Sequence, residues 1–289
     1  MDLVAYTGRL PETGETITGH SFETIPGGKG ANQAIAASRA GADVRMIGAV
    51  GSDPFGGELV DTLAAAGVDC SGVRKIDGAT GTAHITVDDQ GQNTIVVVPG
   101  ANGTVASLAE AERPLVRRAA TLLLQLELPM SVVVEAAQIG HEAGTEVVLT
   151  PAPAVPLPDE LLDAVDVLVP NTGEACRLTG ESDVRAAVAA LVRRVPAVVV
   201  TLGSAGCVLH TRDGDVLELP ALDVPVVDTT GAGDTFAGAL AVARAEGRDW
   251  RDALGWATAA AALSVGRKGA STSAPARTEI DELHAAHRS

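Results

Sequence analysis

Aromatic side chains are nearly absent from this sequence, since only 2% of its 289 residues are Phe, Trp or Tyr. Sites that grip a nucleobase between rings need such side chains, so their scarcity disfavours a nucleoside as the ligand. Basic residues are also few, and 21 Lys and Arg against 37 Asp and Glu give a formal net charge of -16. This charge argues against nucleic acid and against an anionic membrane surface as partners.

Cysteines and long apolar runs are scarce as well. The three cysteines, Cys70, Cys176 and Cys207, are widely spaced and never form a Cys-x-x-Cys pair, which favours a reduced setting. No uninterrupted apolar run is long enough to span a bilayer, and the first residues lack the basic segment of a signal peptide. We therefore expect a cytoplasmic protein without a membrane partner.

Apolar residues make up 46% of the chain, enough to bury a large core in a single α/β domain over residues 1–289. Short apolar runs typical of buried strands alternate with helical patterns and polar breaks. This alternation predicts a mainly parallel sheet with helices on both faces. The expected strands are 44–50, 120–128, 146–149, 165–169 and 198–202, and the expected helices include 56–66 and 131–143.

Two regions, residues 13–24 and 82–98, depart from this pattern. Their alternating apolar and polar residues are typical of exposed β-ribbons, and the second region contains an Asp-Asp-Gln-Gly turn. Residues 95–98 are Ile-Val-Val-Val, which is too apolar for a solvated hairpin. This strand either packs on its own domain or is covered by another subunit.

The segment 228–236 reads DTTGAGDTF and lies between a short β-branched run, 222–227, and an alanine-rich helical pattern. A strand–turn–helix is expected here. Glycines let backbone N–H groups point into the turn, and the helix start adds partial positive charge, as in anion sites. Asp234 would repel a phosphate there, but it suits a base that takes the proton of a hydroxyl attacking a phosphoryl group. Alternatively, it only compensates the helix dipole.

A second glycine-rich turn, PGGKGANQA at residues 26–34, also runs into a helix. Its glycine spacing differs from that of a P-loop, and Ala31 stands where a P-loop has Ser or Thr. The glycines let the backbone approach a small polar ligand. Lys29, Asn32 and Gln33 supply donors and acceptors of the kind that a sugar needs.

Together, the two segments resemble the two signatures of the PfkB family of carbohydrate kinases, and the similarity runs from Asp2 to about Glu279. The resemblance implies a three-layer α/β sandwich with a mainly parallel sheet and a small β lid, formed by residues 13–24 and 82–98. The GGKGANQA wording is most similar to members that phosphorylate D-ribose at its 5-hydroxyl with ATP. Ribose, ATP, and a second copy paired through the lid as a homodimer are the implied partners.

Other activities remain open within and outside this family. One is a nucleoside kinase for adenosine or a pyrimidine riboside, and another is a PfkB kinase for a different sugar. A third is a non-catalytic relative that senses a sugar or a nucleotide. The presence of Asp234 and of both glycine turns argues against this third alternative.

The resemblance also assigns site residues. Asp234 is the implied base, and the backbone amides of Gly231, Ala232 and Gly233 hold charge on the moving phosphoryl group. The implied sugar-binding residues are Asp2, Gly27, Gly28, Lys29, Asn32, Glu127 and Asp234. The implied nucleotide-binding residues are Asn171, Glu174, Thr201, Gly203, Ser204, Gly206, Gly233 and Thr258.

Several of these residues also have a simple structural explanation. Glu127 follows a buried strand, where ligands of open α/β sheets bind, but a Glu at a strand end is often only solvated. Asn171 and Glu174 resemble the family motif that orders Mg²⁺ and its waters, or they merely start a helix. Thr258 stands where relatives often have Asn or His, and its shorter side chain places one adenine contact in doubt.

The resemblance further implies a K⁺ site beside the anion site. A hard cation takes oxygen ligands, and Asp228 is the carboxylate of the proposed set. Asp228 could instead be an ordinary turn-capping residue. The implied K⁺ ligands are side-chain or backbone oxygens of Asp228, Thr230, Ser264, Arg267, Gly269 and Ser273.

The first residues depart from the family pattern. Members usually open with a β-strand that ends in Gly-Ser-x-Asn-x-Asp-Leu, and here Asp2 aligns with the sugar-binding Asp, without the strand and the Asn before it. Without an interior strand, its neighbours are left unpaired and apolar surface stays open. We therefore expect either that Met1 lies inside a longer gene product or that this form is destabilised and binds sugar poorly.

Overall fold

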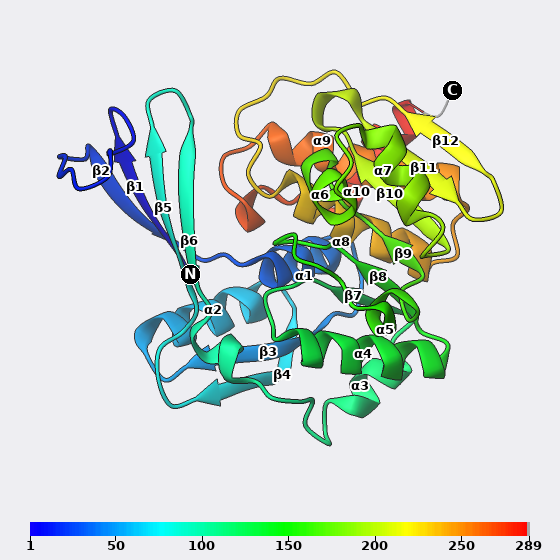
Figure 1. Ribbon diagram of the computed structural model, residues 1–289, viewed down its shortest axis with the longest axis horizontal. Coiled ribbons are helices and arrows are strands. Elements are labelled where there is room, and N and C mark those ends of the chain that lie inside the picture. The colour runs from blue at the N-terminus through cyan, green and yellow to red at the C-terminus, as the bar shows by residue number, and fades with distance from the viewer. Residues whose placement is uncertain (288–289) are drawn as a thin grey trace.

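Parallel strands rich in valine and leucine form the centre of the molecule (Figure 1). The computed structural model describes residues 1–287. Its largest sheet has six strands in the order β12-β11-β10-β9-β8-β7. Strands β7 to β10 are parallel, β11 pairs antiparallel with β10, and β12 pairs antiparallel with β11. These strands are β7 (Thr121–Leu124), β8 (Glu146–Leu149), β9 (Val167–Leu168), β10 (Ala197–Thr201), β11 (Cys207–Thr211) and β12 (Val216–Leu219).

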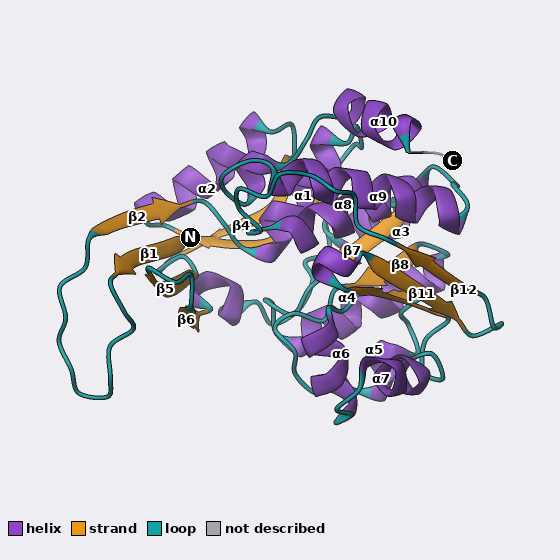
Figure 2. Cartoon of the chain, turned by 90° about the horizontal axis from the view of Figure 1, so that it is seen from above, coloured by secondary structure: helices purple, strands orange, loops and turns teal. Residues whose placement is uncertain are grey.

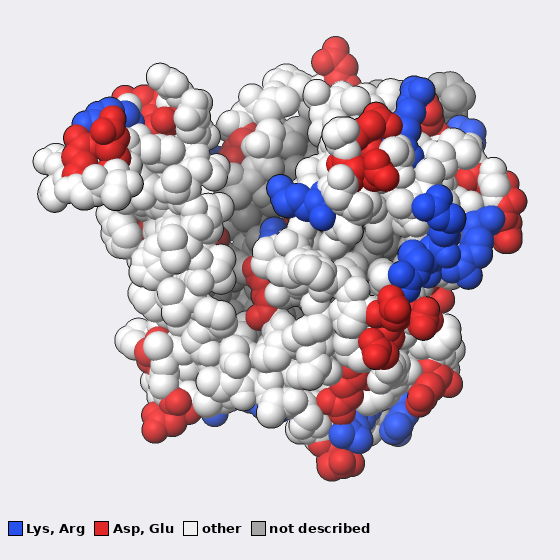
Figure 3. Space-filling view, in the orientation of Figure 1, with Lys and Arg blue, Asp and Glu red and all other residues white. Residues whose placement is uncertain are grey.

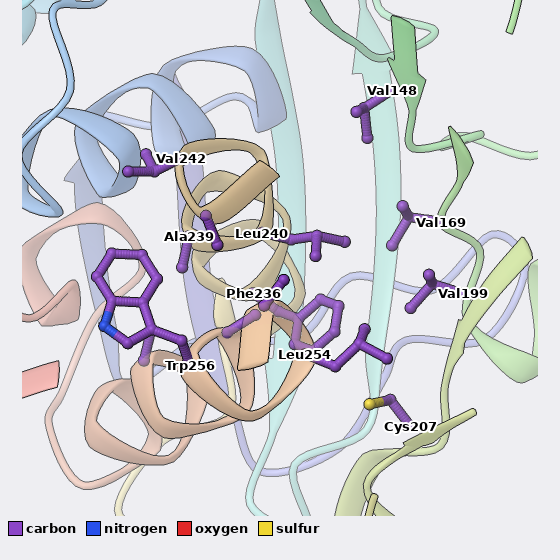
Figure 4. Packing of buried hydrophobic residues seen from close by; sticks show 14 of the residues in the cluster. Val148, Val169, Val199, Cys207, Phe236, Ala239, Leu240, Val242, Leu254 and Trp256 are labelled. Carbon is purple, nitrogen blue, oxygen red and sulfur yellow. The ribbon is translucent and has the colours of Figure 1, made fainter. Parts of the chain in front are cut away.

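Helices cover both faces of this sheet, because alternate residues of its buried strands point to opposite sides. Val148 and Val199 pack on α8 and α9, and Figure 4 shows Leu240 of α8 directed toward the strand valines. Val147 and Val198 pack on the other side. The first layer holds α1 (Lys29–Arg39), α8 (Ala232–Ala245) and α9 (Trp250–Val265); the second holds α4 (Met130–Ala143), α5 (Asp159–Leu162), α6 (Thr172–Thr179) and α7 (Val184–Leu191).

Side-chain caps fix the starts of several helices. Asp53 accepts a hydrogen bond from Gly56 N at the start of α2 (Pro54–Ala65), and Asp249 accepts one from Asp252 N at the start of α9. Such caps satisfy backbone donors that the helix leaves unpaired. The remaining helical segments are α3 (Arg113–Arg118), α10 (Arg277–Ala286), η1 (Gly100–Thr104), η2 (Gly203–Ala205) and η3 (Ser271–Ser273).

A separate four-stranded sheet, called here the outer sheet, stands away from the body at the upper left of Figure 1. Figure 2 shows the same sheet, with the long loop between β1 and β2 at one end. The strands of β6 and β1 pair with β5 in antiparallel and parallel fashion, respectively. The order is β2-β1-β5-β6, with β1 (Asp2–Thr7), β2 (Ser21–Ile25), β5 (Thr82–Asp88) and β6 (Asn93–Val98).

The body sheet is interrupted between β3 (Arg45–Gly51) and β7. Strand β3 pairs with β4 (Asp69–Ile76), and β7 pairs with β8, but β3 and β4 form a sheet of their own. A cavity of about 550 Å³ is lined by both strands, and apolar side chains such as Met46, Leu122 and Val242 contribute to its wall. This gap agrees with the expectation that neighbouring strands lack a partner and that apolar surface stays open.

Most of the expected body elements are confirmed. The strand at 146–149 has the expected bounds, while the strand expected at 120–128 ends at Leu124, because the chain turns there toward α4. The run 222–227 is not a strand; the amides of Val227 and Asp228 both donate to Val265 O, so this segment lies against the end of α9. In the region 13–24 only residues from Ser21 onward form a strand.

None of the helices within residues 1–287 has the length and apolarity needed to cross a membrane. The three cysteines are free, and burial raises the pKa of the Cys207 thiol to about 11.

Candidate active site

The amino end of α8 is open to an anion. Gly231 precedes the helix with a φ of 73°, and no side chain among the described residues caps this end. Ala232 N donates to Thr229 O at 3.3 Å, so this amide is engaged within the turn rather than free as expected. The exposed Gly233 lies in the first turn, where backbone N–H groups lack an acceptor within the helix. The turn therefore suits a phosphate.

Asp234, also in the first turn of α8, is held by two side chains of α1. Asn32 Nδ2 donates to Asp234 Oδ2 at 3.0 Å, and Gln33 Nε2 donates to Asp234 Oδ1 at 2.9 Å. Both oxygens of the Asp234 carboxylate are thus held in place by side chains of α1. The geometry joins the two glycine-rich segments, which are about 200 residues apart in sequence, into one site.

The first glycine turn packs on two further carboxylates. Lys29 N donates to Glu127 Oε2 at 2.9 Å. A Cβ on Gly27 would lie 2.2 Å from Asp2 Oδ2, and one on Gly28 would lie 3.7 Å from Glu127 Oε2. Glycine at position 27 is required, because any side chain there would collide with the Asp2 carboxylate.

The carboxyl groups of this pocket share a perturbed electrostatic environment. Burial raises the pKa of Asp234, against the opposing effects of Lys29 and of the hydrogen bonds from Gln33 and Asn32. Burial also raises the pKa of Glu127 and that of Asp2, and the charge of Asp234 adds to both shifts. A raised pKa is typical of a carboxylate that works as a base.

One buried acceptor in this pocket has no partner. Asn32 is 8% exposed, and its Oδ1 makes no hydrogen bond within residues 1–287, while its Nδ2 is bound to Asp234. Leaving a buried polar atom unsatisfied costs about 1–3 kcal/mol, so such an atom needs an explanation. A ligand hydroxyl beside Asp234 would supply the missing donor.

The residues expected on the nucleotide side gather at the carboxyl ends of neighbouring strands. Asn171 forms an isolated parallel bridge with Thr201. Beyond Thr201, Gly203 and Gly206 adopt positive φ angles of 60° and 98° around the exposed Ser204. Ligands of open α/β sheets bind at this end of the strands.

Three residues expected to bind the nucleotide or its metal have structural partners. Asn171 and Glu174 form a reciprocal capping box at the start of α6. The hydroxyl of Thr258 lies 3.8 Å from Cys207 Sγ, and Thr258 is 8% exposed. A contact from Thr258 to a nucleotide is therefore limited to a small surface.

Two loops meet beside the anion turn. Asp228 Oδ1 accepts from Thr230 N and Oδ2 accepts from Gly269 N, both at 2.9 Å. Burial raises the pKa of the Asp228 carboxyl group, but these hydrogen bonds and the charge of Lys268 outweigh burial and hold the pKa below its ordinary value. A Cβ on Gly231 would lie 2.9 Å from Ala270 Cα, so the second loop packs directly on the turn.

The other residues expected around a cation lie in the same two loops, in the last turn of α9 and in η3. Ser264 O accepts from Arg267 N at 3.0 Å, and Ser273 Oγ donates to Ala270 O at 2.6 Å. The set offers oxygen atoms, which are the ligands that a hard cation takes. Asp228 also has the turn-capping role that the sequence left open.

Figure 3 shows that the face between the outer sheet and the body is hollowed, with acidic atoms inside the hollow. Sequence reasoning missed two residues near it. Gln125 donates through Nε2 to Gln33 Oε1, and Thr150 Oγ1 accepts from Gln33 Nε2 at 3.1 Å. Their position directly after β7 and β8 is the signal that could have identified them, because both strands end beside the site.

A carboxylate held by two amides next to an uncapped helix start and a polar pocket is the arrangement expected of a phosphotransferase that acts on an alcohol group. The protein-family model of the pfkB family carbohydrate kinases matches residues 1–277, and the chain belongs to this family. It is a sugar kinase of the ribokinase-like fold.

Similar proteins cover nearly the whole chain. Ribokinase of Bacillus subtilis is 41% identical, over 98% of this chain and 96% of the relative. Ribokinase of Schizosaccharomyces pombe is 39% identical, over 97% of this chain and 93% of the relative. Ribokinase of Arabidopsis thaliana in complex with ribose and ATP matches with a TM-score of 0.92 and 36% identity, over 98% of this chain and 95% of that one.

Proposed function

We propose that this protein transfers the γ-phosphoryl group of ATP to the 5-hydroxyl of D-ribose, giving D-ribose 5-phosphate and ADP. The observation that carries the proposal is the position of Asp234, held by Asn32 and Gln33 beside an uncapped helix start. Relatives named ribokinase at 41% and 39% identity support ribose as the sugar.

Each group in the reaction has an assigned role. The 5-hydroxyl oxygen attacks the γ-phosphorus, its proton passes to Asp234, and the bond to the β-phosphate oxygen breaks as ADP leaves. Backbone amides at the start of α8, from Gly231 to Gly233, hold the charge of the moving phosphoryl group. The amide of Ala232 must leave Thr229 O to take part.

The sugar pocket is formed by three carboxylates and one lysine. Asp2 and Glu127 accept hydrogen bonds from sugar hydroxyls, and Asn32 Oδ1 accepts one beside Asp234. Lys29 is the cation near these groups, since it lowers the pKa of Asp2, Glu127 and Asp234. The outer sheet acts as a lid that excludes water, so that hydrolysis of ATP does not compete.

The nucleotide lies at the carboxyl ends of β9 and β10. It is held by the turn after Thr201, with Gly203, Ser204 and Gly206, by Gly233, and at its edge by Thr258. Asn171 and Glu174 fit Mg²⁺ with its waters, because Glu174 is partly exposed and uses only Oε2 in its capping box. Asn171 and Glu174 would hold the ion through its waters, and Mg²⁺ would there supply positive charge that offsets the charge of the phosphates.

Oxygen atoms of Asp228, Thr230, Ser264, Arg267, Gly269 and Ser273 would hold K⁺ beside the anion turn. The ion would order this turn without touching the substrate. We expect higher activity in potassium than in sodium buffer after exhaustive dialysis. Equal rates in the two buffers would contradict this assignment.

The protein forms a homodimer through the outer sheet. Strand β6 is exposed along its entire length, and Ile95, Val96, Val97 and Val98 are 54%, 63%, 55% and 47% exposed. An apolar strand at the edge of a sheet is a site of association unless something covers it. A second outer sheet, packed against the first, would bury it.

A coupled ADP-release assay with a panel of substrates tests the proposed function. The panel contains ribose, 2-deoxyribose, fructose, adenosine and uridine, each with ATP and Mg²⁺. We expect the highest kcat/KM with ribose. A preference for a nucleoside would replace ribose by that substrate, and no ADP release with any compound would support a binding protein instead of a kinase.

A further inference from the structure

Gln33 has no atom left for a substrate. It lies on α1, is 2% exposed, and its Nε2 donates both to Asp234 Oδ1 at 2.9 Å and to Thr150 Oγ1 at 3.1 Å. Its Oε1 accepts from Gln125 Nε2. Every polar atom of this amide is therefore committed within the protein.

The orientation of this amide is anchored to the body sheet. Gln125 Nε2 also donates to Leu123 O at 3.3 Å, and the Thr150 hydroxyl donates to Leu124 O at 3.1 Å. Because the Thr150 hydroxyl donates its hydrogen to Leu124 O, it can only accept the hydrogen bond from Gln33. The Nε2 atom of Gln33 is consequently fixed toward Asp234, and an amide turned by 180° would place Oε1 against a carboxylate.

We propose that Gln33 is a positioning residue that acts through Asp234, by fixing the plane of its carboxylate and keeping it ionised. The proposal rests on the proposed role of Asp234 as the base. Asn32 differs from Gln33, because it binds Asp234 with Nδ2 and keeps Oδ1 free for a ligand. Gln33 thus connects the base to the ends of β7 and β8, whereas Asn32 connects it to the sugar.

The charges around Asp234 explain why such a donor matters. Asp2 of β1 and Glu127 after β7 are like charges. Lys29 of α1 is the opposing cation at Asp234, and the Met1 amine together with Lys29 opposes the charge of Asp2. Burial raises the pKa of Asp234, and the hydrogen bond from Gln33 lowers it. A base works only when it is deprotonated, so losing this donor moves the acidic limb of the rate profile to higher pH.

Two substitutions of Gln33 test the proposal through kcat, KM and their pH dependence. Gln33→Met removes the donor and keeps the length, and we expect kcat to fall by about 10- to 100-fold, the effect of losing one hydrogen bond to a charged group. The KM for ribose and for ATP should stay within about threefold of the parent values, since Gln33 touches neither substrate. The acidic limb of kcat should move to higher pH.

Gln33→Glu places a third carboxyl group against Asp234. We expect a larger shift of the acidic limb in the same direction than in Gln33→Met, because two like charges at hydrogen-bonding distance cannot both ionise. The matched control is Gln138→Glu on the exposed side of α4, which should keep the parent's profile.

If a Gln33 variant fails to fold, Thr150→Val provides the second test. It removes one anchor of Gln33 and leaves the bond from Gln33 to Asp234, so we expect a smaller shift of the limb in the same direction. A parent-like pH profile in a folded Gln33 variant, with only a lower Tm, would overturn the proposal. An active Asp234→Asn variant would instead overturn the role of the base, so the two failures are distinguishable.

Discussion

Two strands of this protein contain the same tripeptide, Val-Val-Val, and have opposite surroundings. In β10 the side chains of residues 198–200 are 0% exposed, whereas those of residues 96–98 in β6 are between 47% and 63% exposed. Strand β10 lies between β9 and β11 with helices on both faces, and β6 pairs with β5 alone. The same tripeptide at residues 132–134 lies in the helix α4, so neither the strand nor its burial is decided by these three residues, and the neighbours of each segment decide whether its valines are covered.

The body sheet and the outer sheet also contribute different residues to the candidate active site. The body sheet carries Thr150 and Gln125 at its strand ends, and these support Asp234 through Gln33. The outer sheet contributes Asp2 at the first position of β1, next to Gly27, and exposes the apolar residues 95–98 of β6. Substitutions in the two sheets should therefore change different properties.

The largest expected effect is the loss of the fold when a charge enters the covered strand. In Val199→Asp a carboxylate lies among apolar side chains without a partner, which costs several kcal/mol out of a total stability of about 5–15 kcal/mol. We expect little or no cooperative thermal unfolding by circular dichroism. Val97→Asp in the exposed strand should keep the fold and its cooperative unfolding, with Tm lowered only as far as the proposed dimer contact of β6 stabilises the parent. Equal loss of Tm in both variants would contradict the comparison.

The second effect concerns catalysis supported by the body sheet. Asp234→Asn removes the base, and we expect kcat to fall by about 10²- to 10⁴-fold while ATP binding and the fold are retained. Asn32 can turn its amide to accept from the new side chain, because its Oδ1 has no partner within the described chain. Single-turnover rates and ATP titration by calorimetry provide the measurement. A rate within a few-fold of the parent's would exclude Asp234 as the base.

The third effect concerns the facing edges of β3 and β7, each of which pairs with a strand on its other side alone. Met1 packs on Val50 at the end of β3, and its amine donates to Gly81 O at 3.0 Å, so a segment joined to Met1 would reach the cavity between β3 and β7. We expect a six-residue extension of alternating Val and Ile to raise the free energy of unfolding by about 3–6 kcal/mol, from the burial of about two side chains. Urea unfolding measures it, with a Gly-Ser extension of equal length as control. Equal stability of the two extended forms would show that no strand enters the cavity.

The smallest effect concerns association through the uncovered strand. Val97→Asp should turn the dimer into a monomer in sedimentation velocity at micromolar concentration, because a charge opposes burial of β6. We expect the KM for ribose to rise by roughly tenfold with little change in kcat, since the outer sheet is the proposed lid over the sugar and does not contain the proposed base. The matched control is Val216→Asp on β12, where the parent residue is 51% exposed. A monomeric parent protein would overturn the dimer directly.

The sequence by itself determined the elements whose signals are local. Strand 146–149, the helix expected at 131–143, and the glycine turns before α1 and α8 follow from periodicity and turn residues. The roles of Asp234 and Asn32 were also predicted from the two motifs and from their resemblance to a known family.

Only the tertiary structure decided which distant groups meet. The bond from Gln33 to Asp234 spans 201 positions, and the bond from Gln125 to Gln33 spans 92, so no local pattern contains either of them. The same holds for the exposure of Val97 and for the interruption between β3 and β7. Propensity and periodicity act over a few residues. Burial and hydrogen bonding between strand ends depend instead on which strands lie side by side in the folded sheet.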